Sequence, residues 1–192
     1  MNNLFRALNI PHRPNYDLVE SKRLNLTKAT TRITRHFPIP EDQRDPGLVQ
    51  FLQEHGIFVK FSELFYTAPG AQRNIHIDGN RLGIDIFKMN WVYGADGSTM
   101  KWFELKQDFE PKLQPTYVGT YAYVFPEDQC NLLYETEIKH PCVIHAGIPH
   151  TVLNNTNEGR WCVSYTISDI DTGRIVTWDS VVAKLGQYFI NQ

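Results

Sequence analysis

The sequence has no long hydrophobic run and no block of basic residues. No apolar stretch approaches the roughly 20 residues that a membrane-spanning helix requires, so an integral membrane protein is not expected. The 19 lysines and arginines are offset by 21 aspartates and glutamates. Without a clustered basic patch, a protein that binds nucleic-acid phosphates is not expected either.

Cysteine is scarce as well, because the 192 residues contain only Cys130, Cys142 and Cys162, and no two of them form a C-x-x-C pair. An odd number of widely spaced cysteines is typical of reduced thiols. The N-terminal stretch M-N-N-L-F-R-A-L-N-I-P-H-R-P has no apolar segment of the kind that secretory signals carry. We therefore expect a cytoplasmic protein.

The composition that is present is typical of a folded domain. Hydrophobic residues make up 42% of the chain and charged residues 21%, and the length suffices for one domain with a buried core. We expect a single domain over residues 1–192. Residues 1–42 are rich in proline and predict an extended arm with one short strand. Two roles are open for this arm, shaping the mouth of a site or forming a homodimer.

A change of pattern after Ile57 predicts a β core over residues 57–177. Short runs of β-forming residues alternate with turn signals such as A-P-G and N-N-T-N-E-G. Many short strands with few helices indicate a mainly β fold of antiparallel strands, and a double-stranded β-helix, or jelly roll, fits the strand number. The predicted strands are 57–66, 73–78, 81–93, 100–106, 117–126, 132–138, 142–145, 149–154, 160–168 and 173–177.

Two helices are predicted to flank these strands. In D-P-G-L-V-Q-F-L-Q-E-H-G, Asp45 suits the N-cap, Pro46 the first helical position and Gly56 the C-terminal stop. The segment T-W-D-S-V-V-A-K-L-G-Q-Y-F near the C-terminus has apolar residues at helical spacing and predicts a closing helix.

The stretch R-N-I-H-I-D-G places His76 and Asp78 two residues apart in a predicted strand. Side chains at i and i+2 point to the same face of a strand, so a nitrogen and an oxygen ligand would converge. The alternative is a pair of polar residues on a solvated strand face. Two residues do not make a metal site, so further ligands must come from elsewhere in the chain.

A second segment, I-P-H-T-V-L-N-N-T-N-E-G-R-W-C-V-S-Y, supplies those candidates. We expect residues 149–154 and 160–168 to pair as a β-hairpin, with His150 opposite Val163 or Ser164. Arg160 would then lie opposite Leu153 or Asn154, and the histidine and the arginine would face one interior. His145 competes with His150 by position, and strand parity does not decide between them.

Two imidazoles and one carboxylate form the facial triad of non-haem Fe(II) oxygenases. A guanidinium offers two parallel N–H donors to a carboxylate. His76-Ile-Asp78, His150 and Arg160 resemble the H-x-D…H…R pattern of the iron(II)/2-oxoglutarate-dependent dioxygenases. The resemblance covers about Phe65 to Ser168 and is nearest to aspartyl/asparaginyl and prolyl hydroxylase-like members of phage and marine bacterial type.

The resemblance implies that His76, Asp78 and His150 hold Fe(II), and that Arg160 binds the C5 carboxylate of the cosubstrate 2-oxoglutarate. It implies hydroxylation of a small-molecule or peptide substrate with O₂. Cys162 departs from the pattern, since several subfamilies carry serine two residues after the arginine.

Strand parity adds three weaker candidates around the same interior. Asn90 would form part of the inner wall and contact the C1 carboxylate of 2-oxoglutarate, Lys88 shares its parity, and Ser164 would support a histidine or the cosubstrate. Two other functions remain open. One is a non-catalytic, metal-containing binding module of cupin-like fold, and the other is a zinc hydrolase.

Overall fold

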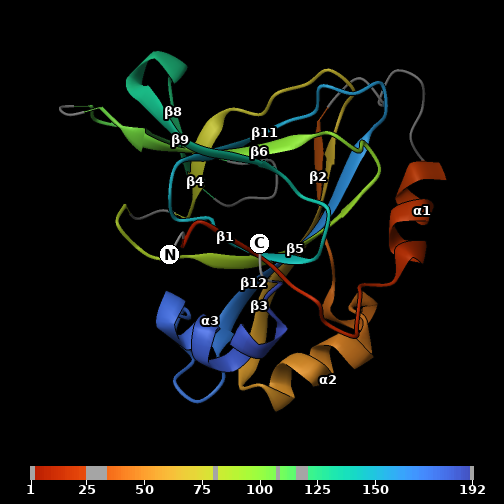
Figure 1. Ribbon diagram of the computed structural model, residues 1–192. Helices are drawn as coiled ribbons and strands as arrows, with labels where there is room; N and C mark the ends of the chain where they lie inside the picture. The colour runs from red at the N-terminus through yellow and green to blue at the C-terminus, as the bar shows by residue number, and fades with distance from the viewer. Residues whose placement is uncertain (1–2, 25–33, 80–81, 107–108, 116–120, 191–192) are drawn as a thin grey trace.

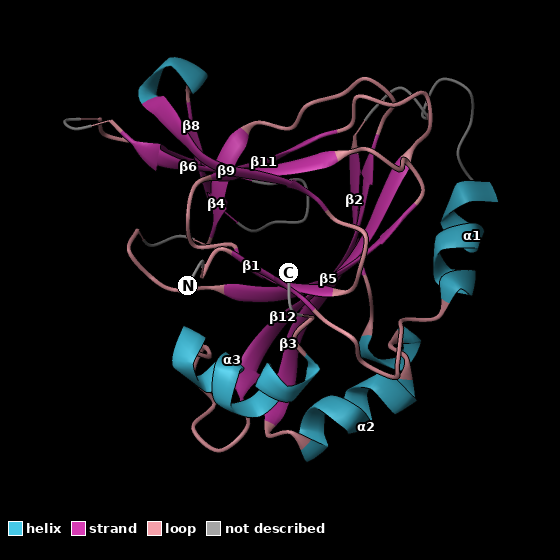
Figure 2. Cartoon of the chain, in the orientation of Figure 1, coloured by secondary structure: helices cyan, strands magenta, loops and turns pink. Residues whose placement is uncertain are grey.

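The computed structural model describes residues 3–24, 34–79, 82–106, 109–115 and 121–190. Strands dominate this part of the chain, with helices at its periphery (Figure 2). The elements in chain order are β1 (Phe5–Ala7), α1 (Tyr16–Leu24), β2 (Arg35–Pro38), α2 (Pro46–Glu54), β3 (Ile57–Thr67), β4 (Ile75–Asp78), β5 (Phe87–Tyr93), β6 (Thr99–Leu105), β7 (Lys112–Pro115), β8 (Tyr121–Phe125), β9 (Cys130–Glu137), β10 (Cys142–His145), β11 (His150–Leu153), β12 (Arg160–Asp169) and α3 (Trp178–Leu185).

Two antiparallel sheets of six strands face each other (Figure 1). We call the sheet with strand order β1-β10-β5-β12-β3-β2 the first sheet, and the sheet with order β7-β8-β4-β11-β6-β9 the second sheet. Neighbours in space are mostly distant in sequence, which is the jelly-roll arrangement expected from the strand pattern. The mainly β fold class is therefore confirmed.

The two predicted helices are present on the outer face of the first sheet (Figure 1). The Asp45 side chain accepts a hydrogen bond from Leu48 N at 2.7 Å, and Gly56 adopts a positive φ of 68° where α2 ends. Both helices bury apolar side chains in one core with the outward residues of β3, β5 and β12. No helix in the described ranges is both long and apolar enough to cross a membrane.

Two sequence predictions about the strands need correction. The strand predicted over 81–93 begins only at Phe87, because the chain turns at Gly83 with a φ of 74°. The segment 173–177 forms no strand and contributes one isolated bridge between Ser168 and Ile175. Residue 81 and the first part of the strand predicted over 117–126 lie outside the described residues.

The segment 1–42 is less extended than its prolines suggest. Its described part contains α1 and two strands, and these strands form the two edges of the first sheet. β1 pairs with β10 and β2 pairs with β3. The sequence indicates β1 and β2 only weakly, because both strands are short and their partner strands lie far along the chain.

The predicted hairpin of β11 and β12 is wrong. β11 pairs with β4 and β6 in the second sheet, whereas β12 pairs with β3 and β5 in the first. The intervening turn carries the chain from one sheet to the other. The buried Asn154 amide fixes this turn by donating to the carbonyl oxygens of Thr67, Ala68 and Glu158 at 3.1, 3.1 and 2.7 Å.

Replacing Asn154 by alanine removes the donor that these carbonyl oxygens share in a buried position. We expect the free energy of unfolding to fall by about 3 kcal/mol, as measured by urea denaturation. Asn155→Ala is the matched control, because Asn155 is exposed in the same turn and its loss should cost less than about 0.5 kcal/mol. Equal effects of the two substitutions would contradict this role of Asn154.

Candidate metal centre

Three side chains of the second sheet converge on one point of its inner face. His76 and His150 lie directly opposite each other on β4 and β11, and Asp78 lies two residues beyond His76. One ligand atom from each of the three lies within 4.8 Å of the others. His76 Nε2 and Asp78 Oδ1 are 3.7 Å apart. The predicted convergence of His76 and Asp78 is therefore observed, and His150 joins them.

Backbone hydrogen bonds fix the tautomers of both imidazoles. Nδ1 of His76 lies 2.8 Å from the carbonyl oxygen of Asn74, and Nδ1 of His150 lies 2.8 Å from that of Ile148. A carbonyl oxygen can only accept, so each Nδ1 carries the hydrogen and each Nε2 keeps a free lone pair. This second hydrogen bond is typical of histidines that bind metals.

The protonation states also suit a metal ion, which requires neutral imidazoles and an ionised carboxylate. Burial lowers the pKa of His150 to about 3, and it lowers the pKa of His76 as well. Burial alone would raise the pKa of Asp78, but the adjacent Lys88 ammonium together with His150 and His76 outweighs it and holds that pKa well below its usual value. All three groups are therefore ready to coordinate at neutral pH.

A stability change with pH should follow from His150. The unfolded chain takes up this proton near pH 6.5 and the folded protein only near pH 3, so the stability contribution is complete above pH 6.5 and falls at lower pH. We expect metal-free protein to lose about 2 kcal/mol between pH 6.5 and 4.5 from this group. Urea denaturation of His150→Gln should show a smaller loss, whereas exposed His140→Gln should behave as wild type.

Lys88 connects Asp78 to a second carboxylate. Lys88 Nζ lies 2.9 Å from Asp78 Oδ2 and 3.0 Å from Glu63 Oε2. Lys88 and Glu63 are nearly inaccessible, with side-chain exposures of 7% and 5%. His36 of β2 contacts the other oxygen of Glu63. Burial disfavours the Lys88 charge, yet the two carboxylates together raise its pKa above the ordinary value.

Lys88→Met should be strongly destabilising, because it leaves two carboxylates without their shared cation. We expect a loss of about 3–5 kcal/mol in the free energy of unfolding. Lys101→Met is the control, since Lys101 pairs with Glu135 at 3.4 Å near the surface and should contribute less than about 1 kcal/mol. A Lys88 variant as stable as the Lys101 variant would show that the interior carboxylates do not depend on Lys88.

The triad opens into a cavity of about 40 Å³ between the two sheets. The first sheet contributes Arg160, Asn90 and Ser164 to its wall, all of them buried. Ser164 and Asn90 lie directly opposite each other on β12 and β5. Arg160 Nε and Asn90 Oδ1 have no hydrogen-bond partner among the described residues. Such unpaired buried atoms are costly and indicate a polar ligand.

The cavity has room for a metal ion and one or two waters. A larger cosubstrate would therefore require lining side chains to move apart. Cys162 also lines this wall, where burial raises the pKa of its thiol. All three cysteines are free in the structure.

The competing histidine, His145, lies outside the triad. Its Nε2 contacts Asp85 at 3.1 Å and its ring packs on Phe87 at 4.5 Å between centroids. Sequence reasoning missed Glu63, which pairs with Lys88, and Arg73, which lines the cavity. Glu63 could have been noticed as the acidic residue of β3, a strand of mostly apolar residues, whereas Arg73 carried no such signal.

Comparison with known proteins addresses the fold. No protein-family model and no curated protein sequence matches the chain. Among solved structures, the chain is similar to the non-haem alpha ketoglutarate dependent carbocyclase SnoK from nogalamycin biosynthesis, with 11% identity and a TM-score of 0.49. That match covers 94% of this chain and 86% of the other.

Two further solved structures are also similar to the chain. A prolyl-4-hydroxylase from Pseudomonas putida shares 16% identity over 86% of this chain and 91% of its own, with a TM-score of 0.45. An oxalate oxidase shares 12% identity over 86% of this chain and 77% of its own, with a TM-score of 0.39. At these identities and TM-scores the matches assign no role to any residue, so the role of each residue has to be argued from the site.

Proposed function

We propose that the protein is an Fe(II)- and 2-oxoglutarate-dependent oxygenase that hydroxylates a small-molecule or peptide substrate. The observation that carries this proposal is the convergence of two Nε2 lone pairs and one carboxylate beside a buried arginine with an unpaired Nε. A zinc hydrolase would use the same three ligands but gives no role to the arginine. The 192 residues would act as one oxygenase domain in the cytoplasm.

His76, Asp78 and His150 would hold the metal ion. This donor set, two imidazoles and one carboxylate, suits Fe(II) and leaves coordination positions open. Fe(II) with bound 2-oxoglutarate supplies the activation of O₂, and the overall reaction converts 2-oxoglutarate, O₂ and a C–H bond into succinate, CO₂ and an alcohol. The protein orients the reactants and excludes water.

Arg160 would bind the far carboxylate of 2-oxoglutarate. It is 3% exposed and makes no ion pair within the described residues, so its charge is available. The planar guanidinium of Arg160 can donate two parallel N–H groups to a carboxylate, which a lysine ammonium cannot do. Asn90 Nδ2 and Ser164 Oγ, on the same wall, would donate to the cosubstrate, because 2-oxoglutarate offers only acceptor oxygens.

The first test is the absorption spectrum of the anaerobic Fe(II) protein. Adding 2-oxoglutarate should produce a weak visible charge-transfer band in wild type and none in Asp78→Ala. Arg160→Met should require at least about 30-fold more 2-oxoglutarate to reach half of the band, because a desolvated ion pair is lost. Arg174→Met removes an exposed arginine far from the cavity lining and should leave the titration unchanged.

Succinate formation then separates an enzyme from a binding module. With O₂ present, turnover without any added prime substrate should yield slow succinate production in wild type and Arg174→Met. A non-catalytic binding module would form no succinate. If no band forms, and if Asp78→Ala binds Fe(II) as tightly as wild type, the oxygenase assignment is wrong.

A further inference from the structure

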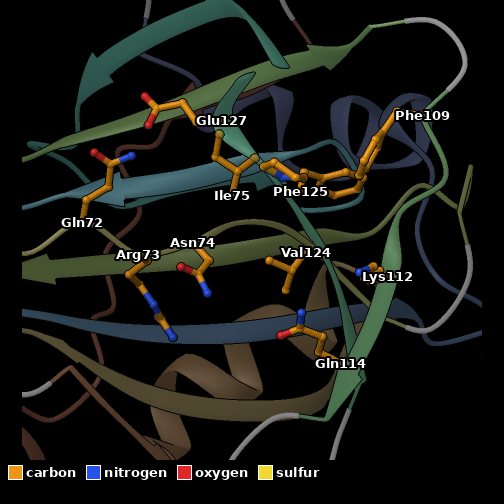
Figure 3. A pocket seen from close by; sticks show the side chains of 11 residues that line it. Gln72, Arg73, Asn74, Ile75, Phe109, Lys112, Gln114, Val124, Phe125 and Glu127 are labelled. Carbon is orange, nitrogen blue, oxygen red and sulfur yellow. The ribbon is translucent and has the colours of Figure 1, made fainter. Parts of the chain in front are cut away.

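A second space lies beside the candidate metal centre. A groove of about 610 Å³ runs along the segment before β4 and along β7 and β8, with Arg73 at one end and Lys112 at the other (Figure 3). Its walls combine polar side chains, such as Asn74 and Gln114, with apolar ones, such as Phe125. The volume lies in the range of pockets that bind small organic molecules.

The groove is continuous with the metal-binding face. His76 lies opposite Val124 on β8, and Val124 lies opposite Lys112 on β7. Residues directly opposite in adjacent strands point to one face, so Val124 and Lys112 extend the row that His76 begins. Asn74 lines the groove and its carbonyl oxygen orients His76. The groove and the candidate ligand set therefore lie next to each other, although none of the three ligands lines the groove itself.

Arg73 lines both the groove and the cavity. Its guanidinium lies over the ring of Phe65, with Cζ 4.7 Å from the centroid. Lys88 Nζ lies 5.6 Å from the same centroid, but two carboxylates already neutralise it. Within the described residues the Arg73 side chain makes neither an ion pair nor a hydrogen bond. A partly buried cation with no direct ion pair is unfavourable, so this position favours an anionic ligand.

The charges around the groove indicate which kind of anion would bind Arg73. If Arg160 binds the far carboxylate of 2-oxoglutarate and Lys88 stays with its two carboxylates, Arg73 is the partly buried cation left in the groove, because Lys112 at the other end is exposed. A monocarboxylate balances one guanidinium and accepts two parallel N–H donors from it. A phosphate monoester carries nearly two negative charges at neutral pH and would leave one of them unpaired.

We propose that the groove binds the prime substrate and that Arg73 recognises a carboxylate on it, so that the substrate is a small carboxylic acid. The proposal deepens the oxygenase function and rests on it. Arg73 acts as the specificity residue, because it touches the substrate at a group remote from the reacting C–H bond. The polar and apolar walls of the groove would contact the remainder of the molecule.

The test measures binding to protein loaded with Mn(II) and saturating 2-oxoglutarate, by titration calorimetry. The probes are N-acetyl derivatives of leucine, phenylalanine, glutamine and aspartate, each compared with its primary amide. Loss of a desolvated ion pair weakens binding substantially, so at least one acid should bind wild type about 30-fold more tightly than its amide. Arg73→Met should reduce this preference below about 3-fold.

Two further variants serve as controls. Arg73→Lys keeps the positive charge but loses the two parallel N–H donors, so its preference for the acid over the amide should be intermediate. This variant tests the role of Arg73 even if Arg73→Met is unstable. Arg174→Met, at an exposed arginine, should match wild type. The affinity for 2-oxoglutarate, measured in the same variants with Mn(II), should change less than about 3-fold when Arg73 is replaced.

The outcomes separate the two proposals. If acids and amides bind wild type alike, or if none of the acids binds, the carboxylate assignment is overturned. It is also overturned if Arg73→Met weakens 2-oxoglutarate as strongly as Arg160→Met does, since Arg73 would then hold the cosubstrate. If Arg160→Met leaves the affinity for 2-oxoglutarate unchanged, the oxygenase function itself fails.

Discussion

One buried ammonium group joins the two sheets across the interior. Lys88 and Glu63 belong to the first sheet and Asp78 to the second, and Lys88 Nζ lies within 3.0 Å of both carboxylates. In a poorly solvated interior such a link is favourable only while every member is present. The position of Asp78, and with it the candidate ligand set, therefore depends on the packing of the sheets against each other.

The candidate site is likewise built from residues of both sheets. His76, Asp78 and His150 come from the second sheet, while Arg160 and Asn90 come from the first. The distance between the metal ligands and the arginine is consequently set by the separation of two packed sheets, about 10 Å in general, and not by the register of one ladder. The crossing at Asn154 is what places consecutive strands on opposite sides of the cavity.

The sequence predicts the parts of the site that follow from local rules. His76 and Asp78 share a strand, so their common face could be derived from parity alone. The interior position of His150 and Arg160 was predicted correctly, although the hairpin that supported it does not exist. The error arose because a polar turn between two strands is compatible with pairing or with a crossing between sheets. The long-range contact of Asn154 with β3 decides between them, and no local pattern shows it.

The charged residues around the triad could be predicted only in part. Lys88 was noted for its parity, but Glu63 is its partner from a strand 25 residues earlier. Arg73 lies three residues before His76, and in a regular strand it would point to the opposite face. It reaches the cavity because β4 begins only at Ile75, so the preceding residues are free of strand alternation. Departures of this kind depend on tertiary packing.

The pairing of β1 with β10 has a consequence for the time at which the site can form. β10 lies more than 130 residues after β1 in the chain, and His150 and Arg160 follow β10. A nascent chain that has not reached residue 150 offers one imidazole and one carboxylate of the triad, too few to retain a metal ion firmly. Contacts of such long range form late in folding. The candidate ligand set is thus completed only late in folding, once both sheets have formed.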